Sequence, residues 1–101
     1  MLIRSQDKRM IVNFDNICTV SAFPEKDSED IYVEDGTGSL MVGRYSTKAK
    51  AMKVLDMIQE AYANVELIPM AVQNIGKMFQ KAIGKAIMNK MIFQMPEEGS
   101  V

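Results

Sequence analysis

Residues 69–90 constrain the fold more than any other part of the chain, because they are periodic throughout and contain no acidic residue. Their apolar residues recur at steps of three and four, the spacing of one face of an α-helix. These residues are Val72, Ile75, Phe79, Ala82, Ala86 and Ile87. Pro69 suits a first helical turn, where its missing N–H would have no partner anyway. The pattern predicts a helix over residues 69–90.

The first 45 residues are typical of β-structure, because β-branched and aromatic runs alternate with turn-forming residues. We predict five strands there, over residues 2–4, 10–14, 17–23, 31–33 and 40–45, and a closing strand over residues 91–95. Consecutive strands joined by short turns pair antiparallel. The fold class is therefore α+β. A single domain is expected, in which an antiparallel β-meander of five to six strands packs with two helices, the second at an oligomer interface.

A first helix is predicted over residues 46–64, with Ser46 as its N-cap. Its buried face is marked by apolar residues at helical spacing: Ala51, Val54, Leu55, Ile58, Ala61 and Tyr62. The residues that follow, as far as Ile68, would link this helix to the second one. Pro96 would end the closing strand and begin the tail of residues 96–101, in which we expect Glu97 to Val101 to be disordered.

Composition excludes the commoner kinds of active site. The 101-residue chain has no histidine and one cysteine, Cys18, so the usual zinc and cysteine-hydrolase arrangements and an intrachain disulfide are excluded. Cys18 lies in an apolar strand pattern, so we expect it to be buried. No catalytic motif occurs, and we expect a protein that is not an enzyme and needs no cofactor. Without a signal peptide or an apolar run long enough to span a membrane, a cytoplasmic protein is expected.

Charge is divided along the chain. Residues 1–40 carry four basic and eight acidic residues, whereas residues 41–101 carry eight basic and five acidic ones. Lys77, Lys81 and Lys85 stand four apart, so on a helix they form one cationic row. That row is either a solvated face or the lining of a groove for an anion, to which Arg44 and Lys48 would add. Nucleic acid is a poor match, because the row lacks interleaved arginines and aromatic residues.

Residues 69–90 also favour self-association. Gly76 and Gly84 each cost about 1 kcal/mol relative to alanine in a helix interior, which suggests that another backbone approaches them closely. Five methionines follow residue 65, and methionine is favoured at adaptable interfaces. We therefore predict a homodimer or a higher homo-oligomer through this segment. A membrane-surface helix is a poorer match, because the segment lacks tryptophan.

Three stretches of the chain form a recognisable set: IRSQDK followed by IVN (residues 3–13), VGRYSTKAKAMKVLDMIQEA (residues 42–61) and MIFQMPEE (residues 91–98). Together they resemble small phage and prophage proteins of Gram-positive bacteria. Within that group the architecture is similar to the Thoeris anti-defence proteins, which oligomerise and sequester cyclic ADP-ribose-type immune signals. The resemblance implies a phage-encoded protein that binds a cyclic nucleotide signal in the host cytoplasm without cleaving it.

A nucleotide site of this kind needs cations for phosphate, an aromatic face for the base and amides for the base edges. The predicted ligand-binding residues are Arg44, Lys48, Asn74, Lys77, Phe79, Lys81 and Lys85. Phe79 also lies on the apolar stripe, where core packing is its other interpretation. The alternative function is a protein–protein inhibitor or adaptor that docks the methionine-rich second helix onto a partner.

Overall fold

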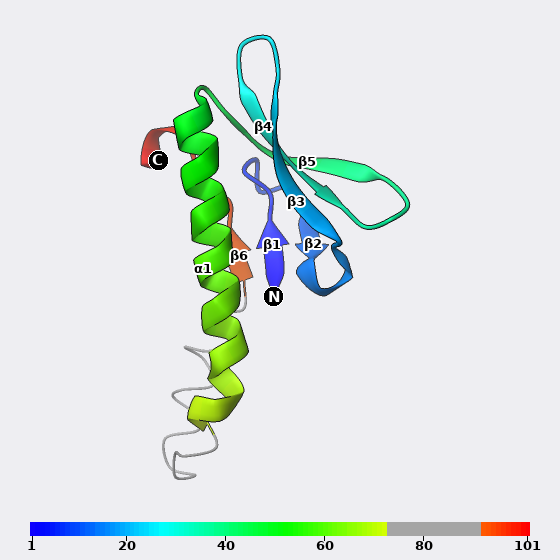
Figure 1. Ribbon diagram of the computed structural model, residues 1–101, viewed down its shortest axis with the longest axis vertical. Helices are drawn as coiled ribbons and strands as arrows, with labels where there is room; N and C mark the ends of the chain where they lie inside the picture. Colours follow the sequence, from blue (N-terminus) through cyan, green and yellow to red (C-terminus); the bar gives the residue numbers. More distant parts are fainter. Residues whose placement is uncertain (73–91) are drawn as a thin grey trace.

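The computed structural model describes the backbone of residues 1–72 and 92–101, with side chains for residues 1–65 and 92–101. Within these residues there are six strands and one α-helix (Figure 1). In chain order they are β1 (Leu2–Arg4), β2 (Ile11–Asn13), β3 (Thr19–Pro24), β4 (Glu29–Glu34), β5 (Ser39–Tyr45), α1 (Lys48–Val72) and β6 (Ile92–Gln94). Two short 3₁₀ turns, η1 (Phe14–Asn16) and η2 (Glu98–Ser100), complete the described part. The α+β class is confirmed, and six strands lie near the predicted positions, with bounds that differ from the predicted ones by up to two residues.

The strands form two three-stranded sheets, so the prediction of one antiparallel meander is wrong. One sheet has the order β2-β1-β6 and the other the order β3-β4-β5. η1 ends β2 and turns the chain out of the first sheet before β3 begins. Strand β6 pairs with β1 in parallel, which requires a long crossover connection, and the whole chain between them supplies it. Pairs of consecutive strands (β1–β2, β3–β4, β4–β5) are antiparallel as expected.

The turn between β4 and β5 is built by Asp35, which confirms the hairpin that the sequence predicts. Its Oδ1 accepts hydrogen bonds from the backbone N–H groups of Thr37 and Gly38, at 2.9 and 3.1 Å. Gly36 has φ +92°, a conformation that a side chain would strain. The β4–β5 pairing also shifts register between Ile31 and Tyr32, a bulge that increases the twist of the strands.

The start of α1 differs from the prediction that Ser46 is the N-cap. Thr47 has that role, since its Oγ1 accepts a hydrogen bond from the backbone N–H of Lys50 at 3.2 Å. The hydroxyl of Ser46 instead donates to the carboxylate of Glu98, and the backbone N–H of Ser46 donates to the same carboxylate at 3.0 Å. A charged acceptor from the end of the chain thus outcompetes the helix for the Ser46 hydroxyl.

The predicted link between two helices is wrong within the described residues, because α1 continues through it to Val72. The residues from Asn64 to Ile68 include no glycine or proline, the two residues that disfavour a helix interior most. Pro69 comes in the last turn of the described helix, where it has no N–H to donate to the carbonyl four residues earlier. The rest of the predicted second helix, and the oligomer interface assigned to it, lie outside the described residues.

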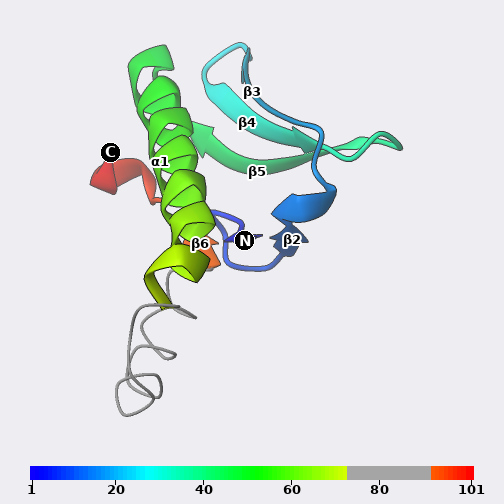
Figure 2. The ribbon, with the colours of Figure 1, turned by 60° about the horizontal axis from the view of Figure 1, so that its bottom comes forward.

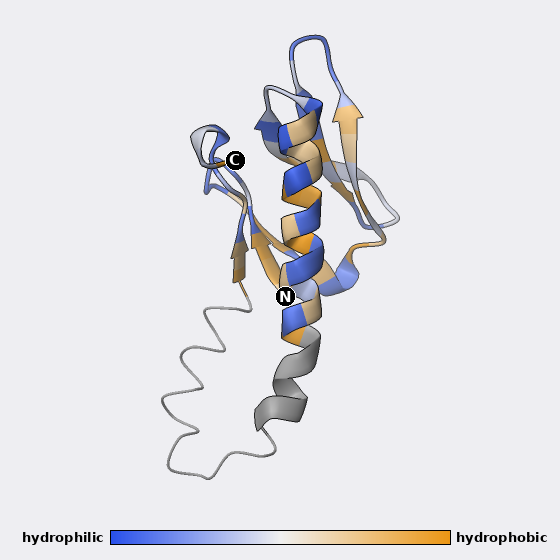
Figure 3. Ribbon diagram, turned by 60° about the vertical axis from the view of Figure 1, so that its left-hand side comes forward, coloured by the Kyte–Doolittle hydropathy of each residue, from blue (hydrophilic) through white to orange (hydrophobic). Residues whose placement is uncertain are grey.

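The core lies where α1 packs against the strands of the two sheets (Figures 1 and 2). The fully or nearly fully buried apolar residues are Met1, Ile3, Ile31, Val33, Val42, Tyr45, Ala51, Val54, Ile58 and Met95. They include three of the six residues predicted on the buried face of α1, and Leu55 and Ala61 pack beside them. Figure 3 shows apolar and polar residues alternating along α1, as a helix with one buried side requires. Cys18 is exposed, so the prediction that it is buried is wrong; it precedes β3 instead of lying within it.

Residues 96–101 are ordered against the body of the protein, so the prediction of a disordered tail is wrong. The phenol of Tyr45 donates a 2.8 Å hydrogen bond to the carbonyl of Pro96. Glu98 accepts from Lys50 Nζ at 2.8 Å in addition to its bonds with Ser46. These polar contacts connect residues 96–98 to β5 and to the first turn of α1. Sequence periodicity does not predict them, because each joins residues that are about 50 positions apart.

Candidate functional site

Two of the seven predicted ligand-binding residues, Arg44 and Lys48, lie in the described part of the chain. Arg44 is in β5, and Lys48 is the first residue of α1; both are exposed. The other five, Asn74, Lys77, Phe79, Lys81 and Lys85, lie outside the described residues. Lys48 and Val72 are at opposite ends of α1, and 25 residues of helix span about 36 Å. The described helix therefore does not bring Arg44 or Lys48 towards the point where residue 73 begins.

Arg44 is engaged by a buried carboxylate. Its Nε and Nη2 donate to the two oxygens of Asp30, each at 3.0 Å, in a bidentate pair. The Asp30 side chain is 1% exposed and also accepts a 2.8 Å hydrogen bond from the hydroxyl of Ser28. These hydrogen bonds, that from Arg44 first, lower the pKa of Asp30 although burial opposes them. Arg44 thus keeps a buried charge satisfied, a structural role that the sequence analysis missed.

Lys48 is the more accessible cation. Its exposed side chain makes no hydrogen bond or ion pair with the residues that the structure describes, so this side chain remains open to an anion. Lys50, two positions along, is by contrast held by Glu98, whose pKa it lowers to about 2 with help from Ser46. The first turn of α1 therefore offers one uncommitted lysine side chain. One exposed lysine is a weak anion site by itself.

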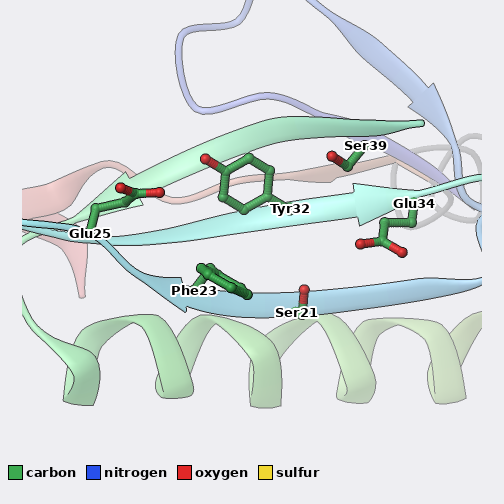
Figure 4. Close-up of a pocket in the computed structure, with 6 residues that line it drawn as sticks. All are labelled: Ser21, Phe23, Glu25, Tyr32, Glu34 and Ser39. Carbon is green, nitrogen blue, oxygen red and sulfur yellow. The ribbon is translucent and has the colours of Figure 1, made fainter.

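The described residues form a surface hollow on the outer face of β3–β4–β5 (Figure 4). It measures about 320 Å³ and is lined by Ser21, Phe23, Glu25, Tyr32, Glu34 and Ser39. We call it the outer-face hollow. Its lining comes from alternate residues of neighbouring strands: Ser21 faces Tyr32 across β3–β4, and Glu34 faces Ser39 across β4–β5. Side chains that alternate in this way share one face of a sheet.

The outer-face hollow combines aromatic surface with carboxylates. Phe23 is 58% exposed, and Tyr32 is half-buried beside it. The carboxylates of Glu25 and Glu34 make no hydrogen bond or ion pair with the described residues, although the charge of Glu25 helps to raise the pKa of Arg44. Aromatic faces and carboxylates both attract cations, so this hollow suits positive charge and repels phosphate. Alternation in residues 19–34 could have revealed an outward-facing set, but the sequence analysis did not assign it a role.

Other kinds of site find no support in the described part of the chain. No group of three or more histidine, cysteine, aspartate or glutamate side chains is placed there to hold a metal ion. Every buried side-chain nitrogen or oxygen described has a hydrogen-bond partner. Among the described helices, none is long and apolar enough to cross a membrane.

Comparison with models of protein families, with curated proteins and with solved structures finds no match to this chain. Its own residues are therefore the basis for any functional conclusion.

Proposed function

We propose that this is a non-catalytic, phage-encoded protein that captures a cyclic nucleotide immune signal. The observation that carries the proposal is the row of Lys77, Lys81 and Lys85 in residues 69–90, a stretch with no acidic residue. Concentrated positive charge of this kind attracts and holds phosphate groups. The choice of a cyclic nucleotide comes from the resemblance of the three stretches to phage anti-defence proteins.

Two of the predicted ligand-binding residues, Arg44 and Lys48, are weaker candidates for capture than the lysine row. Arg44 holds the buried Asp30, and Lys48 lies at the far end of α1 from residue 73. We therefore assign capture to the lysine row in the first place, with Asn74 and Phe79 as the candidates for contact with the base. The outer-face hollow takes no part, because its carboxylates repel phosphate.

The proposal is tested by a depletion experiment. Purified protein is incubated with a panel of cyclic nucleotides and cyclic ADP-ribose isomers, and the filtrate is analysed by mass spectrometry. Depletion of one compound, and its recovery intact after the protein is heated, is the expected result. Failure to deplete any compound would refute capture, and recovery of a degraded product would refute binding without cleavage.

A matched pair of variants locates the capture site. The triple variant Lys77→Glu, Lys81→Glu, Lys85→Glu should no longer deplete the compound. The control replaces Arg9, Lys26 and Lys53, all exposed in the described part, with glutamate. Both triple variants change the net charge equally, so a loss of depletion in the control would show that overall charge, and not the row, is responsible.

The second candidate is a protein–protein inhibitor or adaptor that docks residues 69–90 onto a partner. The observation in its favour is the methionine content of the chain after residue 65, although Met95 is fully buried in the core and contributes to no interface. Under this hypothesis Met78→Ala and Ile83→Ala abolish capture of a protein partner in a pull-down. Neither wild type nor the glutamate variant of the lysine row would deplete any nucleotide.

A further inference from the structure

We propose that the outer-face hollow of β3–β4–β5 binds a lysine- or arginine-bearing segment of a partner protein. This site is separate from the lysine row, and the inference does not depend on nucleotide capture. It rests on three properties of the described residues: exposed apolar surface, two carboxylates that make no hydrogen bond or ion pair with the described residues, and the length of the face that carries them.

The face that carries the hollow leaves large apolar side chains exposed to solvent. Phe23 is 58% exposed and Met41 is 41% exposed, and both belong to the β3–β4–β5 sheet. Met41 reaches the same face, since its Sδ lies 3.8 Å from Nη2 of Arg44, which binds Asp30 of β4. Together with Tyr32 these side chains form an apolar patch with a polar rim, an arrangement that marks interaction surfaces.

The charge of the rim selects the partner. Glu25 and Glu34 line the hollow on either side of the two aromatic residues, Phe23 and Tyr32 (Figure 4). Neither carboxylate has an ion-pair partner among the described residues. Arg44 and Asp30 neutralise each other nearby, so the net charge of the face is negative. An ammonium or guanidinium group over an aromatic ring gains cation–π attraction, and a neighbouring carboxylate adds an ion pair. A basic side chain in the hollow would therefore contact both the aromatic rings and a carboxylate that has no ion-pair partner among the described residues.

The shape favours a chain segment over a free amine. Glu25 follows one end of β3, and Thr19 at its other end pairs with Glu34. The two carboxylates therefore lie at opposite ends of a six-residue strand, which is about 20 Å long. That length accommodates an extended peptide with basic side chains near both carboxylates and an apolar side chain against Phe23. A single small cation would occupy one end and leave the apolar patch uncovered.

Fluorescence anisotropy with a short labelled peptide that alternates lysine with leucine tests the proposal. Wild-type protein should bind this peptide and not a matched peptide that alternates glutamate with leucine. The double variant Glu25→Gln, Glu34→Gln should weaken binding about tenfold, the sum of two exposed charge pairs. Phe23→Ala should weaken it as well, because it removes the apolar contact.

A matched control separates this site from general charge attraction. The double variant Asp56→Asn, Glu60→Gln changes the net charge equally, but at exposed positions of α1. It should bind the lysine peptide as wild type does. No binding by wild type, equal losses in the two double variants, or full binding by Phe23→Ala would each overturn the proposal. Chemical shifts of the wild-type protein should change at the residues that line the hollow; changes confined to other residues would also overturn it.

Discussion

The hydroxyl of Tyr45 connects the end of the chain to the core, and Tyr45→Phe measures what that connection contributes. The side chain is completely buried, and its phenol donates a 2.8 Å hydrogen bond to the Pro96 carbonyl. Without it, that carbonyl keeps a longer 3.4 Å contact from Gln6 Nε2. A hydrogen bond between two neutral groups contributes about 0.5–1.5 kcal/mol net to stability. We expect the substitution to lower the free energy of unfolding at neutral pH by that amount.

The same substitution has a distinct signature at high pH. Burial, with a smaller effect from the charge of Glu98, raises the pKa of Tyr45 from 10 to about 12. The neutral phenol is thus favoured in the folded state. The contribution of the neutral phenol to the free energy of unfolding is complete below pH 10 and is lost as the pH rises towards 12. The loss is at most about 1.4 kcal/mol per pH unit. Tyr45→Phe lacks this loss, so its deficit relative to wild type should disappear between pH 10 and 12.

Urea unfolding of both proteins, at neutral pH and at steps between pH 10 and 12, provides the measurement. Lysines and arginines titrate equally in both proteins, and their effects cancel in the difference. Tyr32→Phe is the control, because it leaves Tyr45 intact and should keep the alkaline loss of stability. Parallel curves for wild type and Tyr45→Phe across the alkaline range would refute the reasoning.

Three further predictions concern neighbouring contacts. Arg44→Met should lower the thermal midpoint by leaving the Asp30 carboxylate buried without its charged partner; because Arg44 lowers the pKa of Asp30, wild type should lose that advantage as the pH falls below 3.8, and an equal midpoint at neutral pH would contradict this. Glu98→Gln should destabilise the protein above pH 4.5 but not near pH 2, because hydrogen bonds lower the pKa of Glu98 from 4.5 to about 2; thermal unfolding against pH would reveal the convergence, and its absence would contradict the role of this carboxylate. Gly43→Ala should cost about 1–3 kcal/mol in urea unfolding, because its Cβ would lie 3.0 Å from the buried ring of Tyr45; a neutral effect would mean that the ring can move.

The local elements of this fold could be predicted because each depends on residues near it in sequence. Asp35 and Gly36 determine the β4–β5 hairpin through hydrogen bonds and a positive φ that involve four consecutive residues. The buried face of α1 was predicted from Ala51, Val54 and Ile58, since helical periodicity reports burial directly. The end of the helix after residue 64 was wrongly predicted, because residues 64–68 include no glycine or proline that would end a helix.

The candidate sites were less predictable, because they depend on pairs that are distant in sequence. Arg44 was predicted to bind a ligand, but the tertiary structure places it against Asp30, 14 positions earlier. Glu98 was assigned to a disordered tail, but it binds Ser46, 52 positions earlier. The sequence gives the sign of each charged side chain, but only the tertiary structure determines which residue it pairs with.

The sequence by itself determined approximately where the strands lie and where the helix begins, the hairpin turn and the division of charge along the chain, but not that the helix continues past residue 64. These follow from backbone preferences and periodicity, which act over a few residues. The tertiary structure alone decided that the strands divide into two sheets, that β6 pairs in parallel with β1, and that Phe23, Tyr32, Glu25 and Glu34 surround one hollow. Those outcomes depend on which distant segments bury their apolar faces together, and burial is a property of the whole folded chain.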